Sequence, residues 1–226
     1  MEITRLHLAT IGKFMGGAPV HGFVIHHPRA GAILVDTGVG YPDSLVAEWK
    51  IVNRTMAVAM AEHHLSPADV RIVINTHLHF DHCGQNAVFQ HAPFYVQRAE
   101  LERGRREESL TAALFDFAGA RFELVDGDAV IAEGVRVIAT PGHTAGHQCV
   151  VVDGENGEEL LIGDAAYTSR IFHRHRDLDL GKVDGQAADA GQWHATMDRL
   201  HDLNAAAVHF CHDTEVVRRA GMEGIS

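Results

Sequence analysis

Residues 76–82 read Thr76-His77-Leu78-His79-Phe80-Asp81-His82 and place four metal-ligating residues in six consecutive positions. The β-branched run Ile72-Val73-Ile74 before them predicts a buried strand over residues 71–75. Alternate residues of an extended chain point the same way, so His77 and His79 can converge on one ion. Asp81 and His82 lie beyond the turn and can face a second ion. Imidazole and carboxylate suit zinc and its neighbours, so we interpret this segment as a metal site rather than a solvated histidine-rich loop.

Three more groups of donor residues follow predicted strands. They are Pro141-Gly142-His143-Thr144-Ala145-Gly146-His147 after residues 135–139, Gly163-Asp164 after residues 160–162, and Phe210-Cys211-His212-Asp213 at the end of a strand over 205–210. Each group alone also fits an ordinary role: a turn histidine, a loop-capping aspartate or a surface His-Asp pair. Four strand-end clusters of nitrogen and oxygen donors are better explained together, as parts of one metal centre.

The composition of the 226-residue chain limits the other function classes. With 19 basic and 30 acidic residues the net charge is −11, which disfavours nonspecific binding to nucleic acid or to an anionic membrane. Three scattered cysteines predict neither a disulfide framework nor a four-cysteine zinc site, and suggest a reducing compartment. We see no secretory pattern in residues 1–10 and no apolar run near the roughly 20 residues of a spanning helix, so we expect a cytoplasmic protein.

The pattern of apolar residues and breakers predicts strands and helices in two similar halves. Strands are expected over residues 2–9, 22–26, 32–36, 71–75, 94–97, 121–125, 130–139, 148–152, 159–162 and 205–210, and helices over 43–64, 99–117 and 187–203. Strands clustered in each half, each followed by helix, suggest two sheets packed face to face with helices outside. We expect one α/β or α+β domain over residues 1–226.

The ligand-type residues occur in an order that resembles a known family. His77-x-His79-x-Asp81-His82, followed by His143, Asp164 and His212, is similar to the metallo-β-lactamase superfamily. Residues 76–86 (THLHFDHCGQN), 140–147 (TPGHTAGH) and 163–168 (GDAAYT) resemble more closely its N-acyl-homoserine lactone lactonases, the quorum-quenching branch, in which a tyrosine stands three residues after the bridging aspartate. The resemblance implies an αββα sandwich: two mixed β-sheets packed face to face, helices on the outer faces, and a metal site at one edge.

The resemblance also implies a role for each candidate ligand. His77, His79 and His143 would hold the first metal ion, and Asp81, His82 and His212 the second, while Asp164 would bridge both together with a water or hydroxide. His209 competes with His212, but the family pattern has His followed by Asp, as in His212-Asp213. The cofactors implied are two divalent ions per chain, zinc foremost, with iron, manganese and cobalt as alternatives.

The activity implied is opening of the lactone ring of N-acyl-homoserine lactones by a metal-bridging hydroxide. Tyr167 would stabilise charge on the carbonyl oxygen, and Asp81 would carry a proton to the ring oxygen. Alternatives are another hydrolase of this fold (a general lactonase or esterase, a β-lactamase or a thioester hydrolase) and a non-catalytic metal-binding domain. The partner expected is a small lactone, with no nucleic acid and no membrane, and the sequence does not predict an oligomeric state.

Other residues receive less specific interpretations. Phe14, Met15, Trp49 and Met56 are candidates for an apolar groove that takes an acyl chain, although Met and aromatic residues at helical spacing more often form core. Residues 169–186, rich in His, Arg, Asp and Gly, match nothing specific in the family. The histidines outside the ligand set, including His26, His27, His173 and His175, are interpreted mostly as surface residues.

Overall fold

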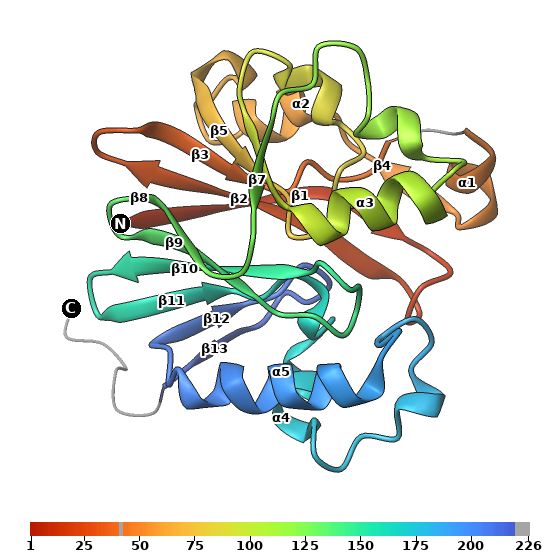
Figure 1. The fold of residues 1–226 in the computed structure, drawn as a ribbon. Helices are drawn as coiled ribbons and strands as arrows, with labels where there is room; N and C mark the ends of the chain where they lie inside the picture. The colour runs from red at the N-terminus through yellow and green to blue at the C-terminus, as the bar shows by residue number, and fades with distance from the viewer. Residues whose placement is uncertain (41–42, 220–226) are drawn as a thin grey trace.

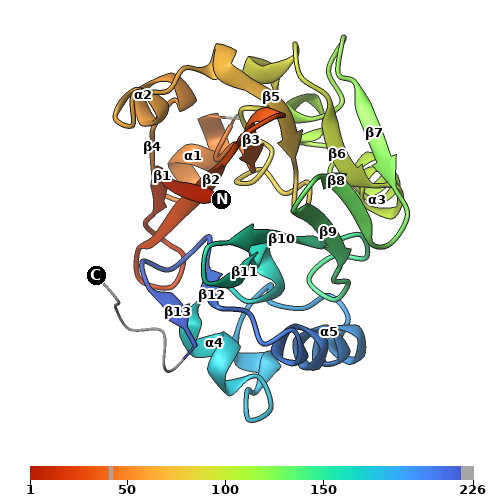
Figure 2. The ribbon, with the colours of Figure 1, turned by 90° about the vertical axis from the view of Figure 1, so that its left-hand side faces the viewer.

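The computed structural model describes residues 1–40 and 43–219, which form two mixed β-sheets packed face to face (Figure 1). Helices α1, α2 and α3 lie on the outer side of the first sheet, and α4 and α5 cover the outer side of the second (Figure 2). The αββα architecture expected from the sequence is therefore confirmed.

The first sheet has seven strands in the order β4-β1-β2-β3-β5-β6-β7. Its strands are β1 (Glu2–Ile11), β2 (Ala18–His27), β3 (Gly31–Val35), β4 (Ile51–Asn53), β5 (Val70–Ile74), β6 (Phe94–Gln97) and β7 (Phe122–Val125). β1, β2 and β3 form antiparallel pairs, whereas β3, β5, β6 and β7 run parallel. The parallel strands bring the carboxyl end of β5, where residues 76–82 begin, to the same edge as the end of β3.

The second sheet has six strands in the order β13-β12-β11-β10-β9-β8. They are β8 (Ala129–Ala132), β9 (Val135–Ala139), β10 (Gln148–Gly154), β11 (Gly157–Leu161), β12 (Ala207–His209) and β13 (Val216–Arg218). Phe23, Ile33 and Ile74 of the first sheet share one buried cluster with Val137 and Val150 of the second. This apolar layer fixes the two sheets against each other, so that loops from both reach one site.

Helices complete the outer layers: α1 (Asp43–Glu48), α2 (Met56–Ala61), α3 (Arg98–Glu107), α4 (Ser169–Arg174) and α5 (Ala190–Asp202), with short 3-10 turns between them. In α5, Asp189 caps the amino end by accepting from Gln192 N. Trp193, Met197 and Leu200 recur at helical spacing and are buried against the second sheet. Within the described residues, no helix has both the length and the apolar character needed to span a membrane.

The helix predicted over residues 43–64 is wrong. The structure has α1, then β4, then α2, because Ile51 pairs with Ile11 at the edge of the first sheet. Lys50 turns the chain with a φ of 52°, and Thr55 starts the next helix by accepting from Val58 N. Met56, a candidate for the acyl groove, is fully buried in the core beside β1, which removes it from any groove.

Two further boundaries differ from the expectation. The strand predicted over 130–139 is a hairpin of β8 and β9, turned at Gly134 with a φ of 74°. The helix predicted over 99–117 ends at Glu107, and only a 3-10 turn (Ala112–Leu114) follows. β13 and α4 have no counterpart among the predicted elements.

Two glycines let the loop after β3 lie directly against the ligand-rich loop after β5. Thr37 N donates to His82 O at 2.7 Å, and Gly84 N donates to Gly38 O at 2.8 Å. A Cβ built on Gly84 would overlap the Gly40 backbone. The two loops therefore hold each other in place only while residue 84 lacks a side chain.

Gly84→Ala should lower the free energy of unfolding by about 2–3 kcal/mol, because backbone must move to admit the methyl group. Chemical denaturation measures the effect. Gly191→Ala in the first turn of α5 is the control. Within the described part of the chain, the nearest atom that its Cβ would meet is Asp189 Oδ1 at 3.4 Å, and a gain of up to about 1 kcal/mol is expected there. Equal stabilities of Gly84→Ala and the parent would contradict the close approach.

Candidate metal centre

The first group of ligand atoms comes from three loops. His77 and His79 follow β5, His143 lies between β9 and β10, and Asp164 follows β11. His79 Nδ1 lies 3.0 Å from His77 Nε2 and 3.0 Å from His143 Nε2, and Asp164 Oδ2 is 3.4 Å from His143 Nε2. The four ligand atoms all lie within 4.8 Å of one another, so one ion could contact them all.

The second group uses the other oxygen of the same aspartate. Asp164 Oδ1 lies 3.2 Å from His82 Nε2 and 3.3 Å from His212 Nε2. Asp81 Oδ2 completes the group at 3.7 Å from His212 Nε2. Asp164 thus lies between two sets of imidazoles, with one oxygen facing each. The structure brings together all seven residues proposed from the sequence.

His209, the competing candidate, lies elsewhere. It sits within β12 and its Nε2 is 2.8 Å from Glu159 Oε2. Two histidines expected on the surface are buried: His27, whose Nδ1 accepts from Ala30 N at 2.8 Å, and His175, whose Nε2 lies 3.2 Å from Asp198. These two corrections arise because their rings complete a turn and a helix end, contacts that local sequence does not reveal.

Unpaired buried atoms support metal binding at this centre. His82 Nε2 and Asp164 Oδ1 are both inaccessible to solvent, and neither has a hydrogen-bond partner among residues 1–40 and 43–219. Buried polar atoms are nearly always bonded, so an orphaned pair facing each other is unusual. A divalent cation between them would satisfy both, and imidazole with carboxylate is a donor set that zinc-like ions prefer. The residues present therefore fit a metal centre.

Three ligand histidines each direct one ring nitrogen outward to an acceptor, so the other nitrogen of each ring faces the ligand group. His82 Nδ1 lies 2.8 Å from Asp36 Oδ2, His212 Nδ1 2.9 Å from Pro19 O, and His143 Nδ1 3.3 Å from Gln186 O. Burial lowers the pKa of His143 to about 4, so the ring stays neutral near pH 7. Burial, His82 and His79 likewise hold the pKa of His77 well below its usual value. Neutral rings are the form that binds metal.

Asp36 is a supporting residue whose role the sequence alone does not reveal. Its carboxylate is buried and accepts from Thr76 N at 2.8 Å, from Thr76 Oγ1 at 2.7 Å and from His82 Nδ1 at 2.8 Å. It therefore joins β3 to the first ligand loop and orients the His82 ring. The only sequence signal was an aspartate at a strand end before Thr37-Gly38, which does not say what it contacts.

Two more buried residues fix the other loops. His147 Nε2 accepts from Asp164 N at 3.0 Å, which sets the backbone of the shared aspartate. Glu100, on α3, accepts from Leu78 N at 3.0 Å and from Thr144 Oγ1 at 2.7 Å, so one carboxylate holds the loops of His77 and His143 together. Burial opposes its charge, but bonds from Arg103 keep the pKa of Glu100 below its usual value.

Tyr167 lies where the metal centre meets a large cavity. Its ring centroid is 5.6 Å from those of His143 and His212, and 4.9 Å from that of Phe14. Burial and the charge of Asp164 raise the pKa of Tyr167, so its phenol stays protonated and can donate. The cavity measures about 860 Å³, and Phe14, Met15 and Trp49 are among the residues that line it, as the sequence suggested for a groove.

Asp36→Asn should weaken metal binding by 10- to 100-fold, because the amide cannot accept all three bonds that orient His82 and its loop. Competition between the metal-free protein and a chromophoric chelator for Co²⁺ measures the change. Asp69→Asn is a matched control, since Asp69 accepts from a backbone N–H of Ser66 far from the ligands. Unchanged Co²⁺ affinity in Asp36→Asn would remove Asp36 from the support of the centre.

Comparison with known proteins identifies the family of the chain. The family model described as the metallo-beta-lactamase superfamily matches residues 15–212. An N-acyl homoserine lactonase of Bacillus thuringiensis is 35% identical over 180 residues, covering 72% of this chain and 70% of the relative. One of Bacillus cereus is 35% identical over 159 residues, which cover 63% of this chain. The match spans 62% of that relative's length, less than two thirds.

A crystal structure of a quorum-quenching N-acyl homoserine lactone lactonase is 25% identical, with a TM-score of 0.75 over 94% of this chain and 92% of that one. The family model covers the loops that carry all seven candidate ligands. The resemblance noted in the sequence is thus confirmed, and the chain belongs to the metallo-beta-lactamase superfamily.

Proposed function

We propose that this protein is a metal-dependent hydrolase that opens the lactone ring of N-acyl-homoserine lactones, a quorum-quenching activity. Relatives 35% identical bear the name N-acyl homoserine lactonase, which supports the substrate class. The observation that carries the proposal is the place of Tyr167, between both ligand groups and the cavity. Residues 1–226 would act as one domain.

We assign the ligands as the sequence suggested. One divalent ion would be held by His77, His79 and His143, and a second by Asp81, His82 and His212. Asp164 would contact both ions. Zinc is the first candidate, ahead of iron, manganese and cobalt. Ions held there would supply a Lewis acid for the lactone carbonyl and a water ionised near neutral pH. Four of the five imidazoles and the shared carboxylate are buried, which keeps this chemistry at one fixed place.

Tyr167 is proposed to stabilise the developing oxyanion. Because its pKa is raised, the hydroxyl remains a donor throughout the working pH range. A lactone carbonyl placed beside it gains negative charge on oxygen as the carbonyl carbon becomes tetrahedral. A single positioned donor of this kind typically contributes about 2.7–4 kcal/mol to transition-state stabilisation.

Asp81 is proposed to move a proton. Its side chain is 12% exposed and lies at the edge of the second ligand group, so Oδ2 can pass a proton to a neighbouring leaving oxygen. In lactone hydrolysis the acyl C–O bond of the ring breaks, water supplies the hydroxyl on the acyl carbon, and the ring oxygen takes the proton. The product is an open-chain N-acyl-homoserine.

The cavity is proposed to take the acyl chain. Its lining includes the apolar side chains of Phe14, Met15, Trp49, Ile171, Leu178 and Val183, together with charged side chains such as Arg170 and Asp184. Burial of methylene groups between such walls contributes about 0.8 kcal/mol each. Tyr167 both lines the cavity and lies beside the ligand histidines, so a ring held at the metal centre would lead its chain into the cavity.

A substrate panel tests the proposal. The metal-loaded protein is assayed by pH-stat and mass spectrometry with N-acyl-homoserine lactones, simple lactones, a cephalosporin and a glutathione thioester. We expect fastest turnover, as kcat/KM, for the acyl-homoserine lactones. Preferential turnover of the cephalosporin or the thioester would reassign the protein to another hydrolase of the superfamily, and no turnover of any compound would favour a binding role.

Tyr167→Phe should lower kcat on an acyl-homoserine lactone by roughly 10- to 1,000-fold, with little change in KM, because the lost donor acts mainly on the developing oxyanion. Metal content and melting temperature should stay near those of the parent. Tyr95→Phe, a partly buried tyrosine on β6 away from the ligands, is the control and should leave kcat unchanged. If Tyr167→Phe kept full activity but had a lowered melting temperature, Tyr167 would be identified as a packing residue with no part in catalysis.

A further inference from the structure

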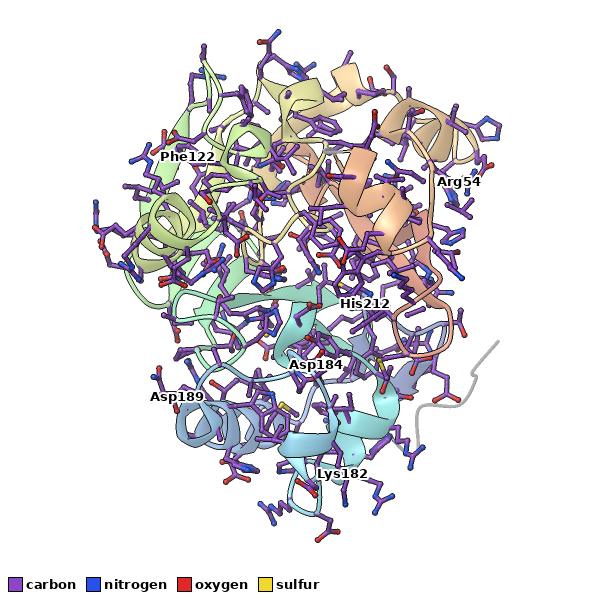
Figure 3. The ribbon with its side chains drawn as sticks, turned by 90° about the vertical axis from the view of Figure 1, so that its right-hand side faces the viewer. Arg54, Phe122, Lys182, Asp184, Asp189 and His212 are labelled. Atoms are coloured by element: carbon purple, nitrogen blue, oxygen red, sulfur yellow. The ribbon has the colours of Figure 1, made fainter. Side chains whose placement is uncertain are left out.

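The segment that the family pattern does not explain, residues 169–186, forms one wall of the cavity and ends at the metal centre. It contains α4 and a 3-10 turn (Leu180–Lys182), and Leu178, Val183 and Gly185 line the cavity. Figure 3 shows Asp184 nearer the middle of the molecule than Lys182, and Asp189 beside the start of α5. Gln186 follows Asp184 by two residues, and its polar side chain is completely buried.

The Gln186 side chain uses both ends of its amide to span the turn that carries Asp164 and Tyr167. Nε2 donates to Asp164 O at 2.8 Å and to Ala165 O at 3.2 Å. Oε1 accepts from Tyr167 N at 3.2 Å. One side chain therefore fixes the spacing between the shared carboxylate and the phenol three residues later.

The main chain around Gln186 reaches the other ligand loop. Gln186 O accepts from His143 Nδ1 at 3.3 Å, and Ala188 N and Asp189 N both donate to Gly142 O, at 2.8 and 3.0 Å. Just before it, a Cβ added to Gly185 would lie 3.0 Å from the Tyr167 hydroxyl oxygen. Residues 185–189 thus contact His143, Asp164 and Tyr167 or their immediate neighbours.

We propose that Gln186 is a positioning residue that sets Asp164, Tyr167 and His143 relative to one another and couples the cavity wall to the metal centre. An amide suits this place because it offers two donors for two carbonyls and one acceptor for an N–H. A carboxylate of the same shape lacks the donors. An apolar side chain leaves Asp164 O and Tyr167 N unpaired in a dry interior, where such groups are costly. Ala165 O would keep a partner in Trp193 Nε1, at 2.7 Å.

Gln186→Met is the main variant, since it keeps the length and removes all three side-chain bonds. Gln97→Met is the matched control: Gln97 is also buried, and its amide also makes three bonds, to Gly127 O, Gly127 N and Gln148 Oε1, none of them to a proposed ligand. Both variants should lower the melting temperature. Only Gln186→Met should alter the metal centre.

The first measurement does not depend on activity. Co²⁺ is added to the metal-free proteins, and its visible absorption and affinity are recorded. We expect Gln186→Met to bind Co²⁺ 10- to 100-fold more weakly, with a changed spectrum, and Gln97→Met to match the parent. Parent-like affinity and spectrum in Gln186→Met would overturn the proposal. If Gln186→Met does not fold, Gln186→Asn replaces it, because asparagine withdraws the amide by one methylene. Gln186→Asn must then show the same change in the Co²⁺ spectrum, and a parent-like spectrum would equally overturn the proposal.

The second measurement rests on the proposed lactonase activity. With metal at a saturating concentration, Gln186→Met should lower kcat by about 10-fold or more with little change in KM. It should add little to the defect of Tyr167→Phe, because the remaining loss then comes mainly from the position of the same phenol. Multiplicative losses in the double variant would overturn positioning through Tyr167. A parent protein that opens no lactone while the Co²⁺ spectrum responds to Gln186→Met would overturn the proposed function and leave the positioning role supported.

Discussion

The Asp164 carboxylate lies between two groups of imidazoles, with Oδ2 3.4 Å from His143 Nε2 and Oδ1 3.2 Å from His82 Nε2. Burial opposes its charge, but His82 and His212 outweigh burial and hold the pKa of Asp164 well below its usual value. A buried negative charge surrounded by nitrogen atoms is stable only while those atoms stay close, and a metal ion in each group would make the arrangement strongly favourable. The rest of the fold serves to hold these groups together.

Neither sheet alone could assemble this centre. His77, His79, Asp81 and His82 come from the end of β5 in the first sheet, whereas His143, Asp164 and His212 follow strands of the second. The apolar layer between the sheets sets their distance, and Asp36, Glu100 and His147 fix the loops by hydrogen bonds. Tyr167 and Gln186 then connect the centre to the cavity. Positions far apart in sequence depend on one another through this small buried network.

Local spacing explains how much of the site the sequence could predict. His77-x-His79-x-Asp81-His82 follows a β-branched strand, so its ligands converge within one loop, and the family order supplied His143, Asp164 and His212. Contacts between distant segments were not predictable in this way. Ile51 joins β1 and breaks the expected helix, and Asp36 and Glu100 look like an ordinary strand-end acid and a charged helix residue. Gln186 lies in a segment without any motif, and only the folded chain places its amide against the Asp164–Tyr167 turn.

Anomalous diffraction tests most directly whether the Asp164 carboxylate is shared between two metal ions. Crystals are grown from protein purified without chelator, and data are collected at the absorption edge of the metal found by elemental analysis. The account predicts two anomalous peaks per chain, one beside His77, His79 and His143 and the other beside Asp81, His82 and His212, each next to an oxygen of Asp164. A single peak, or peaks away from Asp164, in crystals of catalytically active protein would contradict it.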